Sequence, residues 1–327
     1  MPDYRPPWPF TNAHVNTVYP TLLRPAPTIH PASTERIDTP DGDFLDLDWC
    51  RADTGTDSPT RGVAVISHGL EGNARKKYPL GMARALTRQG WDAVCWNFRG
   101  CSGEPNRTLR FYHSGETGDL AHVLRHALAK GYGRAALVGF SIGGNQILRY
   151  LGAQADAVPA EVAAAVAVAP PVDLTTSVHV LERLRNKPYI EYFLISLRRK
   201  IREKAQRFPD RLDPSGLKGA HTFHAFDERY TAPIFGFAGA RDYYAKASSL
   251  PVLGNIRVPT LVLSAKDDPF LSPECFPVAQ ARANPQLYLE TPAFGGHVGF
   301  VRTGNGNVYW SEERAAALIK DHAGGDA

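Results

Sequence analysis

Five residues near the middle of the chain have the pattern of a nucleophilic serine on a sharp turn. Residues 139–143 read Gly-Phe-Ser-Ile-Gly, with a strand-like run before them (134–138) and a helix-like run after them (144–150). A turn from strand to helix pushes a serine hydroxyl clear of a sheet, and the flanking glycines leave room for the tight backbone. We therefore predict that Ser141 is a catalytic nucleophile. The alternative is a glycine-rich turn with an idle serine.

Such a serine requires a general base, which in this kind of site follows both the nucleophile and the acid along the chain. Two histidines follow Asp268, namely His297 and His322. His322 lies beside a C-terminal tail that we expect to fray. His297 follows a short alternating strand, 286–291, on a glycine-rich loop, where catalytic groups are commonly mounted. We predict that His297 takes the proton from Ser141.

The acid that orients this histidine is expected at the end of the apolar run 258–264, where two carboxylates are adjacent. The acid must accept the imidazole N–H and hold the ring in one tautomer. Asp268 precedes Pro269, so its backbone favours extended geometry. We predict Asp268 as the acid and keep Asp267 as the alternative. The other carboxylate would be solvated or would cap the loop.

The third requirement is a pair of N–H donors for the oxyanion that forms when serine attacks an acyl carbon. The strand-like run 61–67 leads into His68-Gly-Leu-Glu-Gly72. One donor is usually the N–H after the nucleophile, and the second comes from the loop after the third strand. We predict the backbone N–H groups of Ile142 and Leu70. The alternative for His68-Gly69 is an ordinary turn at the end of a strand.

The rest of the chain shows the elements that would position these residues. Alternation over 35–50 around Asp41-Gly42 predicts a hairpin. Strands and helices then alternate as far as residue 168, which is typical of a mostly parallel sheet flanked by helices. The predicted strands are 63–67, 91–97, 134–138, 162–168, 258–264 and 286–291, and the predicted helices lie near 76–89 and 116–129.

The alternation stops after Pro170-Pro171 and resumes at 258–264, and the segment between them reads as helical. An insertion at this point would lie over the active site as a lid. We therefore predict an irregular N-terminal surface segment (1–33), an α/β core (34–172 and 256–327) and a helical lid or cap insertion (173–255).

A predicted helix inside the insertion, from about Tyr189 to Phe208, has a basic face. One interpretation is attraction to an anionic lipid surface. The other, which we favour, is the solvated face of a lid, so that at most a weak contact with lipid is expected. The cations are Arg198, Arg199, Lys200, Arg202, Lys204 and Arg207.

The composition fits a soluble globular protein and argues against several other classes. The 327 residues are 43% hydrophobic and 21% charged, with a net charge of +4, and there is no nucleic-acid-binding motif. The proline-rich residues 1–10 do not have the pattern of a signal peptide, and apolar runs such as 162–169 are shorter than the roughly 20 residues that span a bilayer. Four scattered cysteines read as reduced thiols. We expect a cytoplasmic protein without metal or cofactor; the pattern does not indicate an oligomeric state.

Taken together, these motifs resemble a known family, the YheT-like hydrolases (the AB-hydrolase-4 family) of the α/β-hydrolase superfamily. The resemblance implies an α/β-hydrolase fold and a catalytic set carried by Ser141, Asp268 and His297. It also implies hydrolysis of carboxylic esters, with some relatives acting on lipids. One departure is Asn12-Ala-His-Val-Asn-Thr17, where the family usually shows Asn-Pro-His-x-Gln-Thr. The matching stretches are 67–73, 97–107, 112–119, 139–145, 267–270 and 295–300.

We therefore expect a cofactor-independent serine carboxylester hydrolase that forms an acyl-enzyme on short- to medium-chain acyl esters. The alternatives are a lipase or thioesterase acting on longer acyl substrates, because the same triad serves all of them, and a non-catalytic small-molecule-binding member of the fold. The expected partner is a small-molecule ester. Nucleic acid and integral membrane contact are not expected.

Overall fold

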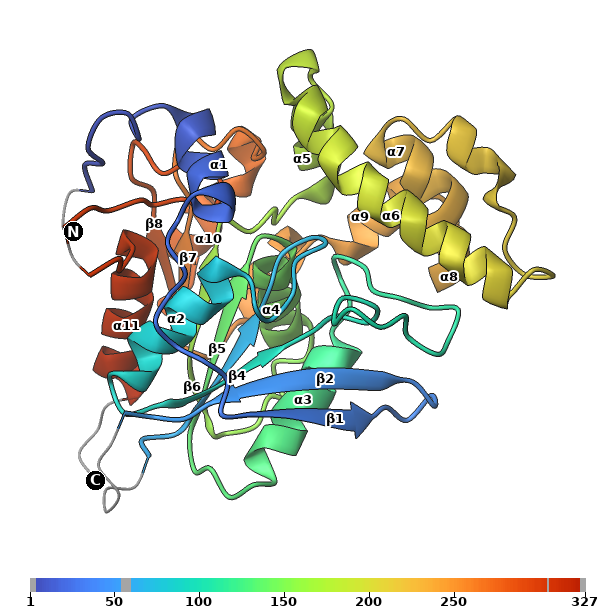
Figure 1. Ribbon diagram of the computed structural model, residues 1–327. Helices are drawn as coiled ribbons and strands as arrows, with labels where there is room; N and C mark the ends of the chain where they lie inside the picture. Colours follow the sequence, from blue (N-terminus) through green and yellow to red (C-terminus); the bar gives the residue numbers. More distant parts are fainter. Residues whose placement is uncertain (1–3, 54–59, 305, 324–327) are drawn as a thin grey trace.

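The chain is built around one twisted sheet, seen edge-on in Figure 1. The computed structural model describes residues 4–53, 60–304 and 306–323. Within these residues the sheet has eight strands in the order β1-β2-β4-β3-β5-β6-β7-β8. The first two strands form a hairpin that pairs antiparallel with β4, and all other neighbours pair parallel. The strands are β1 (Ser33–Asp38), β2 (Phe44–Cys50), β3 (Val63–Ser67), β4 (Asp92–Trp96), β5 (Ala135–Phe140), β6 (Val162–Val168), β7 (Thr260–Leu263) and β8 (Leu287–Glu290).

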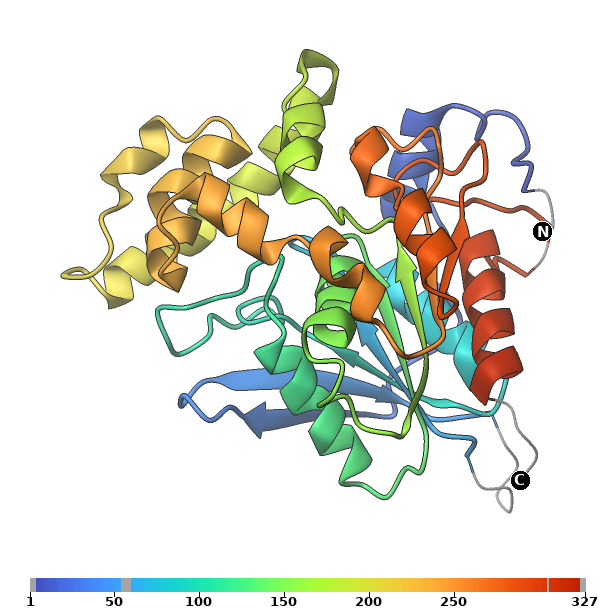
Figure 2. The ribbon, with the colours of Figure 1, turned by 180° about the vertical axis from the view of Figure 1, so that it is seen from behind.

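Helices cover both faces of the sheet, which is why the central strands are apolar along their whole length. Helices α2 (Lys77–Thr87) and α11 (Trp310–Ala323) lie on one face, and α3 (Gly118–Leu128) and α4 (Ile142–Ala153) lie on the other (Figures 1 and 2). Alternate residues of β3 enter two separate apolar clusters, one on each face. The short helix α10 (Val278–Ala283) precedes β8. The predicted fold class, a mostly parallel sheet flanked by helices, is confirmed.

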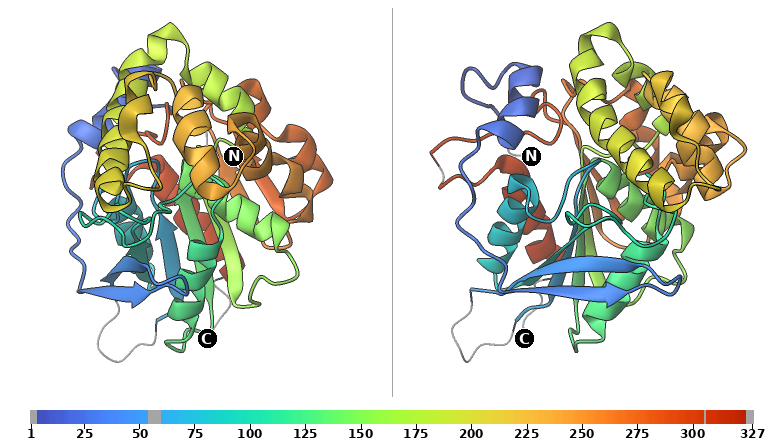
Figure 3. Two further views of the ribbon diagram at one scale, coloured as in Figure 1. Left: turned by 90° about the vertical axis from the view of Figure 1, so that its right-hand side faces the viewer. Right: turned by 45° about the vertical axis from the view of Figure 1, so that its right-hand side comes forward.

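A helical segment interrupts the sheet between β6 and β7. It stands over the edge of the sheet at which the parallel strands end (Figure 3). Its long helix α6 corresponds to the helix that we predicted near 189–208, and its bounds are closely similar. The elements are α5 (Leu174–Leu181), η1 (Leu184–Asn186), α6 (Lys187–Arg207), η2 (Pro214–Lys218), α7 (Phe223–Phe226), η3 (Asp227–Thr231), α8 (Ala232–Phe235), α9 (Ala240–Ala247) and η4 (Leu250–Asn255); η5 (Pro273–Cys275) follows β7.

The cations of α6 do not share one solvated face. For two of them, both the lipid-facing and the solvated interpretation of this helix are wrong. Lys200 and Lys204 are buried, at 8% and 2% exposure. The Lys204 ammonium donates to Asn106 Oδ1 at 2.8 Å and to the Thr108 carbonyl at 2.6 Å. These lysines therefore attach the insertion to the core. No helix in the described part of the chain is long and apolar enough to cross a membrane.

The N-terminal segment is less irregular than predicted. Helix α1 (Ala13–Leu22) begins after Asn12, whose side-chain oxygen accepts from the N–H groups of His14 and Val15. Several β-branched residues and Pro20, which lies inside the helix, lower its intrinsic propensity, so the pattern did not indicate a helix. We also expected the chain to fray beside His322, but α11 continues to Ala323; residues 1–3 and 324–327 lie outside the described residues.

Candidate active site

Ser141 occupies a strained turn between β5 and α4. Its backbone has φ 51° and ψ −120°, a conformation that costs energy for any residue other than glycine. Both flanking positions require glycine, because neighbouring backbone atoms leave no room for a side chain at either one. A Cβ at Gly139 would collide with the backbone of Gly143, and a Cβ at Gly143 would collide with the carbonyl oxygen of His68. The strain is therefore held in place by close packing at the end of β3.

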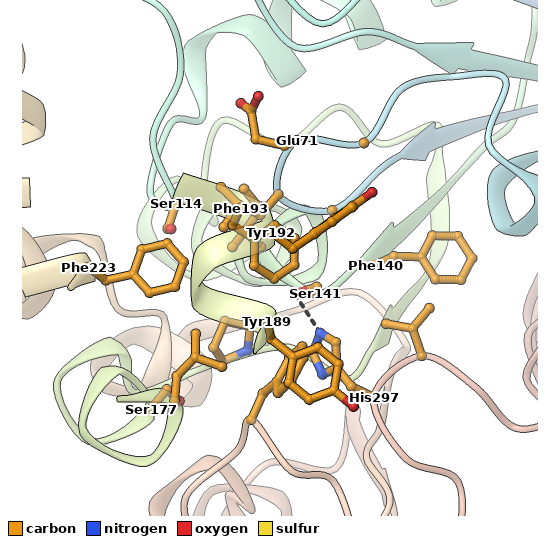
Figure 4. Close-up of a pocket in the computed structure, with 18 of the residues that line it drawn as sticks. Glu71, Ser114, Phe140, Ser141, Ser177, Tyr189, Tyr192, Phe193, Phe223 and His297 are labelled. Atoms are coloured by element: carbon orange, nitrogen blue, oxygen red, sulfur yellow. Dashed lines mark hydrogen bonds between the residues drawn. The ribbon is translucent and has the colours of Figure 1, made fainter. Parts of the chain in front are cut away.

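His297 lies on the loop that follows β8, with its ring between Ser141 and Asp268. Its Nε2 lies 2.9 Å from Ser141 Oγ (Figure 4). Its Nδ1 lies 2.8 Å from Asp268 Oδ2. Phe270 packs against the imidazole, with 4.4 Å between ring centroids. This geometry suits a ring that donates from Nδ1 to the carboxylate and accepts the serine proton at Nε2.

The two adjacent carboxylates have different surroundings. The Asp268 side chain is fully buried, and its second oxygen accepts the Phe270 N–H at 2.8 Å. Asp267 instead accepts the Gly296 N–H at 2.9 Å, and burial raises the pKa of its carboxyl. The structure thus brings Asp268 to His297 and places Asp267 under the loop that carries His297.

Helix α1 holds the His297 loop from outside, which the sequence did not predict. The His297 N–H donates to Thr17 Oγ1 at 2.9 Å, and the Val301 N–H donates to the side chain of Asn16 at 3.2 Å. Asn16 is fully buried and donates to the Phe10 carbonyl at 2.8 Å. The only available signal was the partial agreement of 12–17 with a family motif, from which the sequence departs at Ala13 and Asn16. These contacts place Asn16 and Thr17 among the residues that support the site.

The loop after β3 lies directly beside the serine. A Cβ added at Gly69 would lie 3.3 Å from Ser141 Cβ. Leu70 on this loop and Ile142 at the start of α4 both line the cavity that contains Ser141. Among the described residues, none accepts a hydrogen bond from the backbone N–H of Leu70 or Ile142. Both predicted donors are therefore close to the serine and free to bind a ligand oxygen.

Two tyrosine hydroxyls fix the backbone on both sides of Leu70. The Gly69 N–H donates to the Tyr78 hydroxyl and the Glu71 N–H donates to the Tyr112 hydroxyl, each at 2.9 Å. Burial raises the pKa of both tyrosines, so both hydroxyls stay protonated at neutral pH. The N–H of Leu70 is thus flanked by two anchored peptides.

His68 at the start of this loop is neutral and held in one tautomer. Its Nε2 accepts the Phe98 N–H at 3.1 Å, so Nδ1 carries the proton and donates to the Gly69 carbonyl at 2.7 Å. Burial lowers the pKa of His68 to about 4. Protonation would abolish the bond from Phe98 and place a charge in the core behind the loop.

The neutral state of His68 predicts a specific dependence of stability on pH. Below the ordinary histidine pKa of about 6.5, the unfolded chain binds a proton that the folded protein does not, so stability falls with falling pH. We expect the advantage of wild type over His68→Gln in free energy of unfolding to shrink by on the order of 2 kcal/mol between pH 7 and pH 5. Urea denaturation of both proteins measures it. A constant difference would show that His68 has the same pKa in the folded and unfolded states, and an advantage that grows at pH 5 would show that His68 is charged in the folded state.

A cavity of about 420 Å³ opens in front of Ser141 and His297 (Figure 4). The core, α1 and the insertion all contribute to its wall, and most of that wall is apolar or aromatic. Such a cavity has the size and character of a small-molecule site. No group of three or more His, Cys, Asp or Glu in the described ranges could hold a metal ion. The aromatic residues from the insertion are Tyr189, Tyr192, Phe193, Phe223, Phe226, Tyr243 and Tyr244.

Comparison with known proteins agrees with this architecture. Residues 63–302 match the family model described as the alpha/beta hydrolase fold. The chain is 38% identical to the protein YheT of Escherichia coli (strain K12), with 89% of this chain and 85% of YheT covered. It is 32% identical to phospholipase ABHD3 of Homo sapiens, over 86% of this chain and 70% of the relative.

A solved structure, the esterase Pf2001 of Pyrococcus furiosus, superposes with a TM-score of 0.57 at 16% identity, covering 89% of this chain and 91% of that one. This likeness shows the shared fold. The length and identity of the sequence matches confirm the family resemblance. The chain belongs to the alpha/beta hydrolase fold family, in the YheT-like branch of its esterase- and lipase-type members.

Proposed function

We propose that this chain is a serine carboxylester hydrolase in which Ser141 is the nucleophile, His297 the general base and Asp268 the orienting acid. The observation that carries the proposal is the continuous hydrogen-bonded chain from Ser141 Oγ through the imidazole to Asp268, open to a cavity at the serine end. A nucleophile, a base and an orienter in this relation are the features that distinguish an activated serine from an idle one.

The reaction would proceed in two halves. His297 Nε2 takes the hydroxyl proton as Ser141 Oγ bonds to the ester carbonyl carbon, and the carbonyl oxygen becomes an oxyanion bound by the N–H groups of Leu70 and Ile142. The imidazolium, stabilised by Asp268, then gives its proton to the departing alcohol and leaves an acyl-enzyme. Water attacks this ester with His297 again as base, which releases the acid and restores the serine.

The wall of the cavity supports an apolar acyl group as the part of the substrate that is bound. The named relative ABHD3 is a phospholipase, and a 29% identical yeast relative is a monoacylglycerol lipase, so ester substrates with acyl chains fit the family. We propose short- to medium-chain acyl esters, because a cavity of about 420 Å³ is bounded on several sides by the insertion and α1.

Hydrolysis of p-nitrophenyl esters of increasing chain length tests this function. We expect turnover, with kcat/KM rising by about fourfold for each added methylene until the cavity is filled, because each buried methylene contributes about 0.8 kcal/mol. A fluorophosphonate should abolish turnover, and mass spectrometry should find the label on Ser141. Matched thioesters determine whether the same site prefers sulfur esters.

Two results would contradict the proposal in different ways. Ligand-induced stabilisation without turnover or labelling would identify a non-catalytic binding protein of the same fold. Rising kcat/KM as far as palmitoyl esters would retain the hydrolase but assign it to long-chain, lipase-type substrates.

A further inference from the structure

The carboxylate of Glu71, the residue after the predicted oxyanion donor Leu70, is buried and accepts hydrogen bonds at both of its oxygens. The Lys200 ammonium donates to it at 2.7 Å and the Tyr112 hydroxyl at 2.5 Å, and the Ser196 hydroxyl donates to its second oxygen. The side chain of Glu71 is 6% exposed and that of Lys200 is 10% exposed. Burial raises the pKa of Glu71, but Lys200 and the hydroxyl donors more than offset this, so the group stays ionised.

This carboxylate joins two parts of the fold. Lys200 and Ser196 lie four residues apart on α6, so both point from one side of that helix. Glu71 lies on the loop between β3 and α2, next to Leu70. The long helix of the insertion is therefore bound to the loop that carries the oxyanion donor, through a pair of charges that is shielded from water and thus weakly screened.

The backbone of Glu71 is also constrained. Its φ is 51°, in the left-handed region that residues with a side chain rarely adopt, and its N–H is bound to Tyr112. Surroundings must hold such a conformation in place, and at Glu71 the side chain and the N–H are both anchored. In Figure 4, Glu71 lies on the far side of Ser141 from His297.

We propose that Glu71 is a positioning residue whose pair with Lys200 sets the direction of the Leu70 N–H, so that the oxyanion hole is complete only when α6 is docked on the core. This inference rests on the proposed function, since it requires Leu70 to bind an oxyanion. The substrate need not touch Glu71 for this role.

A neighbouring lysine provides a matched control. Lys204 lies one turn further along α6, is also buried, and donates to Asn106 and Thr108. Its contacts fasten the same helix to the core but do not reach the loop 68–72. Lys204→Met therefore measures the effect on kcat of weakening the attachment of α6 alone. Lys200→Met measures that effect together with the effect of releasing Glu71.

The experiment compares Glu71→Gln, Lys200→Met, Lys200→Arg and Lys204→Met with wild type. For a p-nitrophenyl ester, we expect Glu71→Gln and Lys200→Met to lower kcat by about 10- to 100-fold with KM changed less than about threefold, because a donor misplaced by an ångström acts only on the transition state. An acyl trifluoromethyl ketone, which forms an oxyanion on the serine, should lose affinity by the same factor. Lys200→Arg should recover most of the activity.

Lys204→Met should lower Tm as Lys200→Met does, while kcat stays within about twofold of wild type. Equal losses of kcat in both lysine variants, or an unchanged kcat in Glu71→Gln and Lys200→Met, would overturn the proposal and leave Glu71 as an anchor of the insertion. If Glu71→Gln does not fold, the Lys200→Met and Lys200→Arg pair decides. Full activity in Ser141→Ala would instead refute the proposed function itself.

Discussion

Ser141→Ala lowers kcat for ester hydrolysis by about 10⁵- to 10⁶-fold, the largest effect that we expect for any substitution in this chain. The variant has no atom to form the acyl-enzyme, so only binding and the oxyanion donors remain to act on the attack of water. Its fold should persist, because alanine adopts the Ser141 backbone no worse than serine does and the elbow is held by the packing of Gly139 and Gly143. The residual rate of ester hydrolysis is measured at high enzyme concentration, in reactions that are stopped after long incubation.

Thermal unfolding and binding of a non-hydrolysable ester analogue serve as controls for this variant. Both should be close to wild type. If Ser141→Ala loses its folded state together with its activity, the activity of His297→Ala decides instead, because that variant keeps the elbow intact. Retention of activity would exclude Ser141 as the nucleophile.

Asp268→Asn lowers kcat by about 10⁴-fold, whereas Asp267→Asn changes it by less than about tenfold. An asparagine at 268 presents an N–H to His297 Nδ1, which places the imidazole proton on Nε2, where the ring must accept. Asp267 bonds the Gly296 N–H, and an asparagine oxygen can accept that bond equally well. The two variants have the same chemical change at adjacent positions, so kcat/KM measured side by side isolates the contact with His297.

The opposite order of effects would make Asp267 the acid and would require the loop around Asp268 to rearrange during catalysis. Comparable large losses in both variants would mean that Asp267 supports the His297 loop strongly enough to affect catalysis. Circular dichroism and Tm distinguish this second outcome from general unfolding.

Three segments far apart in the chain converge on the proposed site, and each contacts a different part of it. Helix α1 binds the His297 loop through Thr17 and Asn16. Helix α6 reaches the oxyanion loop through Lys200. The elbow itself is packed against the end of β3. Parts of the chain outside the central sheet therefore contribute to the geometry of the site.

The sequence by itself determined the sheet, the elbow and the order along the chain of the residues that we propose as catalytic. Strands β3 and β6 were predicted at their observed bounds, because strands buried on both faces are short continuous runs of small and β-branched residues that end at turn signals. The elbow was visible because its turn requires glycines at fixed positions around Ser141. These are local requirements, imposed within a few residues of the chain.

Only the tertiary structure decided which groups meet across the molecule. From the sequence, Lys200 and Lys204 look like solvent-facing cations, because no neighbouring residue indicates a partner for them. Their partners lie on the core and are Glu71, Asn106 and Thr108. Likewise, α1 has weak local propensity, and its hydrogen bonds with the His297 loop join residues about 280 positions apart. Buried charges and weak helices are stabilised by partners distant in the chain, and a pattern read over neighbouring residues carries no information on such partners.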